Sequence, residues 1–148
     1  EIINELEFFK LPTVVIIKHA NPSGVAINKN LKMAYKNALK CDPISAFGGI
    51  IATNKKINLD IANELNKTFT EVVIAPEYDD EALIILKKNK NLRLLENKNL
   101  TNLDYEDHLI KSISGGYLVQ DRDIETVSED FSGLVLGTAK YIITAGTK

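Results

Sequence analysis

Residues 13–18 read TVVIIK, a run of β-branched and apolar residues that ends in a lysine. Because its apolar side chains occupy both alternating faces, the run predicts a strand buried from both sides, as in layered α/β folds. Residues 48–53 (GGIIAT), 71–75 (EVVIA) and 92–95 (LRLL) have the same character and predict three further strands. The fold is therefore expected to be built on a sheet whose strands are covered on both faces.

Segments with helical spacing separate these predicted strands. Asn30 is a candidate N-cap of a helix that ends before Pro43, and Asn58 is a candidate cap of a second helix. Acidic residues 79–81 begin a third helix, where the helix dipole favours them. This alternation predicts an α/β fold with a mostly parallel sheet, in which ligands bind at the carboxyl ends of the strands. Residues 21–24 (NPSG) predict the turn after the first strand.

The composition narrows the class of protein. The chain has 148 residues and is 45% hydrophobic, which suffices for one globular domain with its own core. Its 18 basic and 20 acidic residues give a net charge of −2, which argues against a general nucleic-acid binder. The apolar runs are too short to cross a bilayer, and the acidic start lacks the basic residues of a signal peptide. The single cysteine, Cys41, excludes an internal disulfide and a cysteine-rich zinc site, and it fits a reducing, cytoplasmic setting.

Residues 18–24 (KHANPSG) carry the most informative chemistry, because they begin where a buried strand ends. A histidine at such a place can face a cleft and accept a proton near neutral pH. The adjacent lysine supplies a positive charge for a developing oxyanion. From residue types alone, the alternative is that Lys18 points to water and His19 bonds to the turn backbone.

Residues 42–49 (DPISAFGG) form a second candidate stretch. Its two closing glycines allow a ligand to approach the backbone closely. Phe47 is able to stack on a planar base, and the alternative is that it packs in the core. Glu71, at the start of the third predicted strand, is either solvated or accepts hydrogen bonds from an amino group or ribose hydroxyls of a ligand.

Four stretches together resemble a bifunctional purine-biosynthesis enzyme, which joins aminoimidazole carboxamide ribonucleotide (AICAR) formyltransferase to inosine monophosphate (IMP) cyclohydrolase. Residues 18–26 match the family's Lys-His-Ala-Asn-Pro-Cys-Gly-Val-Ala, with Ser23 in place of the cysteine. The other matching stretches are residues 42–49, 71–76 and 115–123. The resemblance runs in order from about residue 8 to residue 123, and the four motifs together make it specific.

The resemblance implies a fold, a reaction and a site. The fold is a three-layer α/β/α arrangement that is cytidine-deaminase-like, of which this chain is one half. The reaction is formyl transfer from the co-substrate 10-formyltetrahydrofolate to the 5-amino group of AICAR, without a metal, in an enzyme that is a homodimer at full length. His19 is implied as the proton acceptor and Lys18 as a stabiliser of the transition state. His19, Gly48 and Glu71 are implied to line the nucleotide site, and Phe47, as an aromatic residue beside Gly48, is expected to be a further substrate contact.

Residues 1–148 are accordingly expected to form a single partial domain, the N-terminal half of the formyltransferase domain. Residues 124–148 are expected to be an atypical tail, which lacks the asparagine that binds substrate in the family. One alternative is a non-catalytic fragment that binds a nucleotide or a partner chain. Another is a zinc-dependent deaminase, but that chemistry requires His-x-Glu and Pro-Cys-x-x-Cys, whereas Ala-Asn follows His19 here.

Overall fold

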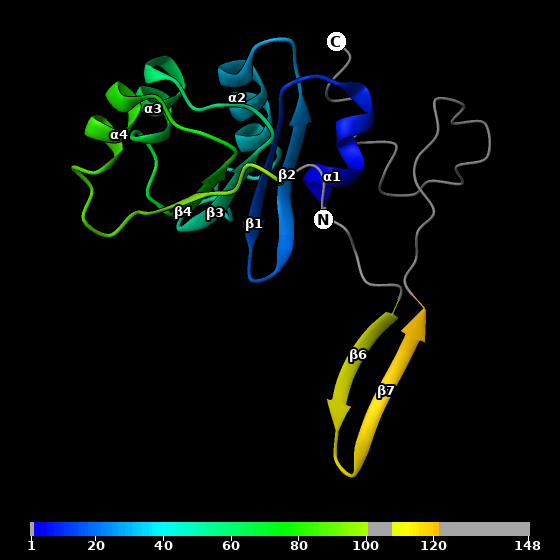
Figure 1. Cartoon of the computed structure of the whole chain (residues 1–148). Coiled ribbons are helices and arrows are strands. Elements are labelled where there is room, and N and C mark those ends of the chain that lie inside the picture. The colour runs from blue at the N-terminus through cyan, green and yellow to red at the C-terminus, as the bar shows by residue number, and fades with distance from the viewer. Residues whose placement is uncertain (1, 101–107, 122–148) are drawn as a thin grey trace.

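The computed structural model describes residues 2–100 and 108–121, and Figure 1 shows their arrangement. The elements, in chain order, are α1 (Ile2–Glu5), the 3-10 helix η1 (Leu6–Phe9), β1 (Thr13–Lys18), β2 (Asn21–Ile27), α2 (Leu31–Cys41), β3 (Gly49–Thr53), α3 (Leu59–Leu65), β4 (Thr70–Ala75), α4 (Asp80–Leu86), β5 (Arg93–Glu96), β6 (His108–Ile113) and β7 (Gly116–Asp121). None of the described helices is long and apolar enough to cross a membrane.

Five strands form one mixed sheet in the order β2-β1-β3-β4-β5. Strand β1 is antiparallel to both of its neighbours, whereas β3, β4 and β5 pair in parallel. The prediction of a mostly parallel sheet is therefore wrong. The reason is β2, which the sequence did not predict: a two-residue turn joins it to β1, and strands joined by so short a turn can only pair antiparallel.

Helices α2, α3 and α4 cover one face of the sheet and bury its main apolar core. Tyr35 of α2, Leu65 of α3 and Leu86 of α4 are almost fully buried there. They belong to the same cluster as Ile16 of β1 and Val73 of β4. Burying such side chains supplies the dominant favourable term in folding.

The opposite face of the sheet is covered only in part. Ile3 of α1 packs there with Val15 and Val25, and the partly buried Leu6 of η1 joins them. Over β3 and β5 this face is open, because Ile50 and Leu95 retain 36% and 51% of their accessible surface. The register places Ile50 on this face, because it lies opposite Ile17, which packs against the cluster of Ile3, Val15 and Val25.

Both predicted N-caps are confirmed. The Asn30 side chain accepts a hydrogen bond from the backbone N–H of Met33, at the start of α2. The Asn58 side chain accepts from the N–H groups of Asp60 and Ile61, at the start of α3. These bonds satisfy donors that the first turn of a helix otherwise leaves without a partner.

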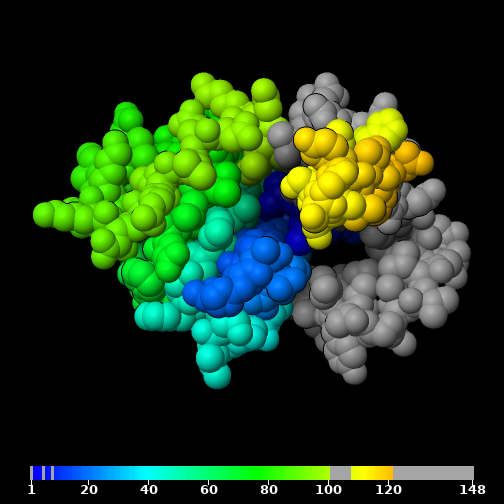
Figure 2. Space-filling model, turned by 90° about the horizontal axis from the view of Figure 1, so that it is seen from below, coloured from blue at the N-terminus to red at the C-terminus, as the bar shows by residue number. Residues whose placement is uncertain are grey.

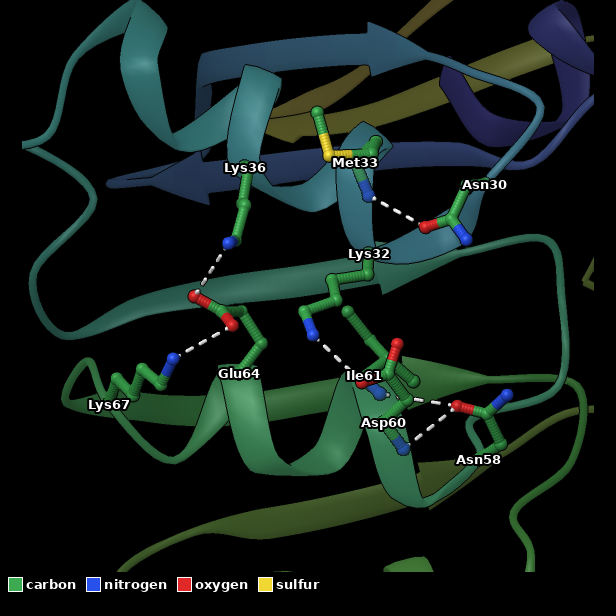
Figure 3. A network of polar contacts seen from close by, with 9 residues as sticks. All are labelled: Asn30, Lys32, Met33, Lys36, Asn58, Asp60, Ile61, Glu64 and Lys67. Carbon is green, nitrogen blue, oxygen red and sulfur yellow. Dashed lines mark hydrogen bonds and ion pairs between the residues drawn. The ribbon is translucent and has the colours of Figure 1, made fainter.

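Ion pairs join α2 to α3 on the outer surface (Figure 3). Lys32 contacts Asp60 at 2.8 Å, and Lys36 contacts Glu64 at 3.6 Å. Lys67, just beyond α3, contacts the same Glu64 at 2.9 Å. Because the lysines and Asp60 remain in contact with solvent, such surface pairs add little to the free energy of unfolding, and the buried core carries most of the stability.

Strands β6 and β7 form a separate antiparallel hairpin. Every residue of both strands is exposed, including Ile110, Tyr117 and Val119. In Figure 1 the hairpin extends away from the five-stranded sheet. Exposed apolar side chains on both faces of a two-stranded hairpin are typical of a segment that packs against another surface.

Candidate functional site

The turn between β1 and β2 consists of His19 and Ala20. Lys18 pairs with Asn21 across the hairpin, and the two residues between them have φ angles of 50° and 66°. Positive φ at both central residues defines a type I′ turn, the connection that matches the natural twist of two strands. The prediction that residues 21–24 form this turn is wrong, because those residues already belong to β2.

A bulge follows the turn. Ile17 lies opposite Pro22 and Ile16 opposite Gly24, so that Ser23 is the extra residue in β2. The Ser23 hydroxyl donates a hydrogen bond to the Ile16 carbonyl oxygen at 3.3 Å. Because β2 is an edge strand, it tolerates Pro22, which lacks an N–H. Bulges of this kind reorient the side chains beside them and are common next to functional sites.

Replacing Ala20 by glycine should raise the free energy of unfolding by about 1 kcal/mol, because an L-residue at positive φ is strained and glycine is not. Denaturation with urea measures the change. The same substitution at Ala34, a buried residue within α2, should instead destabilise the chain by about 1 kcal/mol or more. A destabilised Ala20→Gly variant would show that residue 20 does not adopt positive φ in solution.

Lys18, Gly48 and Glu71 converge at one corner of the sheet. The Lys18 ammonium donates a hydrogen bond to the Gly48 carbonyl oxygen at 3.0 Å. A Cβ atom built on Gly48 would lie 3.1 Å from Lys18 Nζ, 3.3 Å from Phe69 Cε1 and 3.5 Å from Glu71 Oε1. Gly48 also has a φ of 66°, a backbone conformation that favours glycine. Glycine is therefore favoured at this position both by its backbone conformation and by the absence of a side chain.

Phe47 does not pack in the core. It retains 62% of its accessible surface, and its ring centroid lies 5.2 Å from that of Phe69, at an interplanar angle of 43°. Phe69 itself retains 38%. The two rings form an aromatic surface beside Gly48 on which a planar group can stack.

The loop that carries Phe47 is held by its first residue, Asp42. The Asp42 carboxylate accepts a hydrogen bond from the backbone N–H of Ser45 at 2.9 Å. Hydrogen bonds from the Ser45 hydroxyl and then from its backbone N–H keep the pKa of Asp42 below its usual value. Aspartate at such a position stabilises a tight turn, which here leads from α2 to Gly48.

An open cleft of about 400 Å³ lies at this corner, lined by Phe69, Glu71, Lys90, Asn91 and Arg93. Phe69 and Glu71 also flank Gly48, so the cleft lies next to the place where Lys18, Gly48 and Glu71 meet. Figure 2 views the molecule from below, and the β1–β2 turn (blue), the segment before β3 (cyan) and the segment before β5 (green) share the face it shows.

The candidate residues lie at the amino ends of β4 and β5, whereas the sequence predicted that ligands bind at the carboxyl ends. Glu71 is the second residue of β4, and Arg93 is the first residue of β5. Because β1 runs antiparallel to β3, the carboxyl end of β1, with Lys18, meets the amino ends of the parallel strands. The carboxyl-end rule applies where all strands share one direction, and the reversed β1 removes that condition.

The predicted residues are thus largely brought together. Lys18, Gly48 and Glu71 meet directly, and Phe47 joins them through Phe69. His19 lies one residue beyond Lys18 with an exposed side chain, and among residues 2–100 and 108–121 its ring has no hydrogen-bond partner. No group of three or more potential metal ligands from His, Cys, Asp and Glu occurs among the described residues. The predicted tail, residues 124–148, lies outside them.

Sequence reasoning missed the aromatic and basic part of the cleft. Phe69 stands directly before β4, and Lys90 and Arg93 stand in or next to the short segment between α4 and β5. In the sequence, these residues could be recognised only by their position at the amino ends of two predicted strands. That position points to the site only when β1 is known to run antiparallel to β3.

Comparison with known proteins identifies related chains. The family model described as AICARFT/IMPCHase bienzyme matches residues 1–141. The bifunctional purine biosynthesis protein PurH of Mesorhizobium japonicum is 47% identical over 129 residues, which are 87% of this chain and 24% of that protein. PurH of Caldicellulosiruptor saccharolyticus is 46% identical over 87% of this chain and 25% of its own length. PurH of Rhodospirillum rubrum is 53% identical over 78% of this chain and 22% of its own length.

Proposed function

This chain belongs to the AICARFT/IMPCHase bienzyme family of purine biosynthesis, and from that premise we propose that it carries part of a formyltransferase site. It spans about a quarter of the length of the curated relatives that it matches. The proposed reaction moves a formyl group from 10-formyltetrahydrofolate to the 5-amino group of AICAR, in the cytoplasm. The observation that carries the proposal is the convergence of Lys18 Nζ, Phe69 and Glu71 around Gly48.

In the proposed reaction, the amine nitrogen of AICAR forms a bond to the formyl carbon. His19 accepts the amine proton as this bond forms, and the bond between the formyl carbon and the folate nitrogen breaks, with that nitrogen taking up a proton. Lys18 stabilises the negative charge that develops on the formyl oxygen. Its hydrogen bond to Gly48 supports this role, because it fixes the ammonium beside the cleft before any ligand binds.

The remaining residues position the nucleotide. Glu71 accepts hydrogen bonds from an amino group or ribose hydroxyls, and Phe47 and Phe69 offer an aromatic surface to the planar imidazole. Holding two substrates in a reactive geometry supplies a large part of such catalysis. We further propose the family arrangement for the whole enzyme, in which this cytidine-deaminase-like half meets a second half and the full-length chain forms a homodimer.

A second candidate function is a fragment that binds a nucleotide or a partner chain without catalysis. One observation favours it. The face of the sheet over Ile50 and Leu95 and the β6–β7 hairpin are exposed and apolar, as expected of surfaces that another chain or domain covers.

Calorimetric titration of AICAR into the purified chain, followed by addition of 10-formyltetrahydrofolate and detection of the formylated nucleotide, tests both candidates. Saturable binding with product formation is the expected result of the first proposal. Binding without product would support the non-catalytic fragment. Absence of binding at millimolar AICAR would contradict the first proposal and the nucleotide-binding form of the second.

A further inference from the structure

Two cations line the cleft beside Glu71 without a role in the proposed reaction. Lys90 and Arg93 are exposed, and both border the cleft that Glu71 and Phe69 share with Gly48. No ion pair within residues 2–100 and 108–121 engages Lys90, Arg93 or Glu71. The residues that line the cleft therefore carry two positive charges and one negative charge.

The segment that presents these cations is anchored on both sides. The Asn89 side chain accepts a hydrogen bond from the backbone N–H of Asn91, and the Asn89 carbonyl accepts one from the N–H of Leu92. Leu92 packs against the main core. Arg93 opens β5 and lies opposite Val72, the residue after Glu71, so the sheet fixes the Arg93 backbone beside β4.

We propose that Lys90 and Arg93 form an anion subsite, which holds the phosphate or carboxylate group of a ligand whose planar part lies between Glu71 and the Phe47–Phe69 rings. A guanidinium binds both anions through two parallel hydrogen bonds, and an ammonium adds a point charge. Glu71 lines the same cleft, and its carboxylate repels an anion, which favours binding of the anion at Lys90 and Arg93. The inference rests on the proposed function for the identity of the ligand, but not for the existence of the subsite.

Two sources supply such an anion in the proposed reaction, the phosphate of AICAR and the glutamate carboxylates of the folate. The test measures the Kd of the wild-type chain and of the double variant Lys90→Gln/Arg93→Gln for four probes: AICAR, its nucleoside without phosphate, 10-formyltetrahydrofolate, and inorganic phosphate. Lys88→Gln is the control, because Lys88 is an exposed lysine close in sequence that does not line the cleft.

The double variant should lose about 10- to 100-fold in affinity for the anionic ligand that uses the subsite, as expected for charge-assisted hydrogen bonds. A loss for AICAR, with the nucleoside unaffected, identifies the phosphate as the occupant. A loss for the folate alone identifies its carboxylates. The Lys88→Gln control should bind every probe as the wild type does.

Equal affinities of the double variant and the wild type for AICAR, folate and phosphate would overturn the subsite while leaving the proposed function intact. The converse is also distinguishable. If the wild type binds inorganic phosphate through Lys90 and Arg93 but neither AICAR nor folate, the subsite stands and the proposed function falls. Far-ultraviolet circular dichroism of the double variant verifies that it is folded, so that a loss of affinity is not a loss of structure.

Discussion

Replacing Gly24 by alanine should lower the free energy of unfolding by about 3 kcal/mol, at the upper end of the cost of overpacking a core. A Cβ atom at Gly24 would overlap the carbonyl oxygen of Ala38, and it would lie 2.9 Å from the Ala38 carbonyl carbon. Both atoms are helix backbone, which cannot rotate away as a side chain can. Helix α2 would have to move off β2, and buried contacts of Tyr35 would be lost with it.

Urea denaturation of Gly24→Ala and of Gly116→Ala measures this effect against a matched control. A Cβ atom at Gly116 would meet nothing within 4 Å, so that variant should differ from the wild type by less than about 0.5 kcal/mol. A Gly24→Ala chain as stable as the wild type would mean that α2 does not pack on β2 as described. A Gly24→Ala chain that does not fold at all would show that the substitution destabilises the chain more than predicted.

Replacing His19 by alanine should lower the rate of formyl transfer by about 10²- to 10⁴-fold, the usual contribution of a positioned acid–base group. The Kd for AICAR should change only a few-fold, because the proton acceptor acts in the chemical step rather than in binding. Turnover numbers and AICAR titrations on the same preparations separate the two effects.

Two further variants isolate the chemistry of His19 from its place in the turn. His19→Asn keeps a residue that tolerates positive φ but removes the proton acceptor, so it should lose turnover as His19→Ala does. His108→Ala removes the other exposed histidine, which lies in the β6–β7 hairpin beside Asp121, and should retain turnover. Full activity of His19→Asn would assign the proton to another acceptor.

Strong local patterns predicted much of the fold. Residues 13–18, 49–53 and 71–75 form strands because their apolar residues suit burial on both faces, and Asn30 and Asn58 cap helices as predicted. Strand β2 was missed because its first four residues all favour turns. In the structure, however, His19 and Ala20 alone form the turn, and Pro22 is tolerated because β2 is an edge strand.

The site was predictable where it depends on local position and on the family motifs. Lys18 ends a strand, Glu71 lies near the start of one, and Gly48 precedes one, so each was a candidate from the sequence. Phe69 was not, because its nearness to Lys18 depends on which way β1 runs in the sheet. That direction depends on β2, the additional strand between β1 and α2, which the residue pattern did not predict.

The reversed strand also sets an order of events in folding. The β1–β2 hairpin needs only neighbouring residues and should close in about 1–10 μs. Pairing of β1 with β3 has to wait until the chain between them, including α2, has been brought back across the sheet, at the entropic cost of closing a long loop. Lys18 and Gly48 come within hydrogen-bonding distance only at that later step, so a fluorescence or hydrogen-exchange probe at this corner should report the late phase of refolding rather than the first collapse.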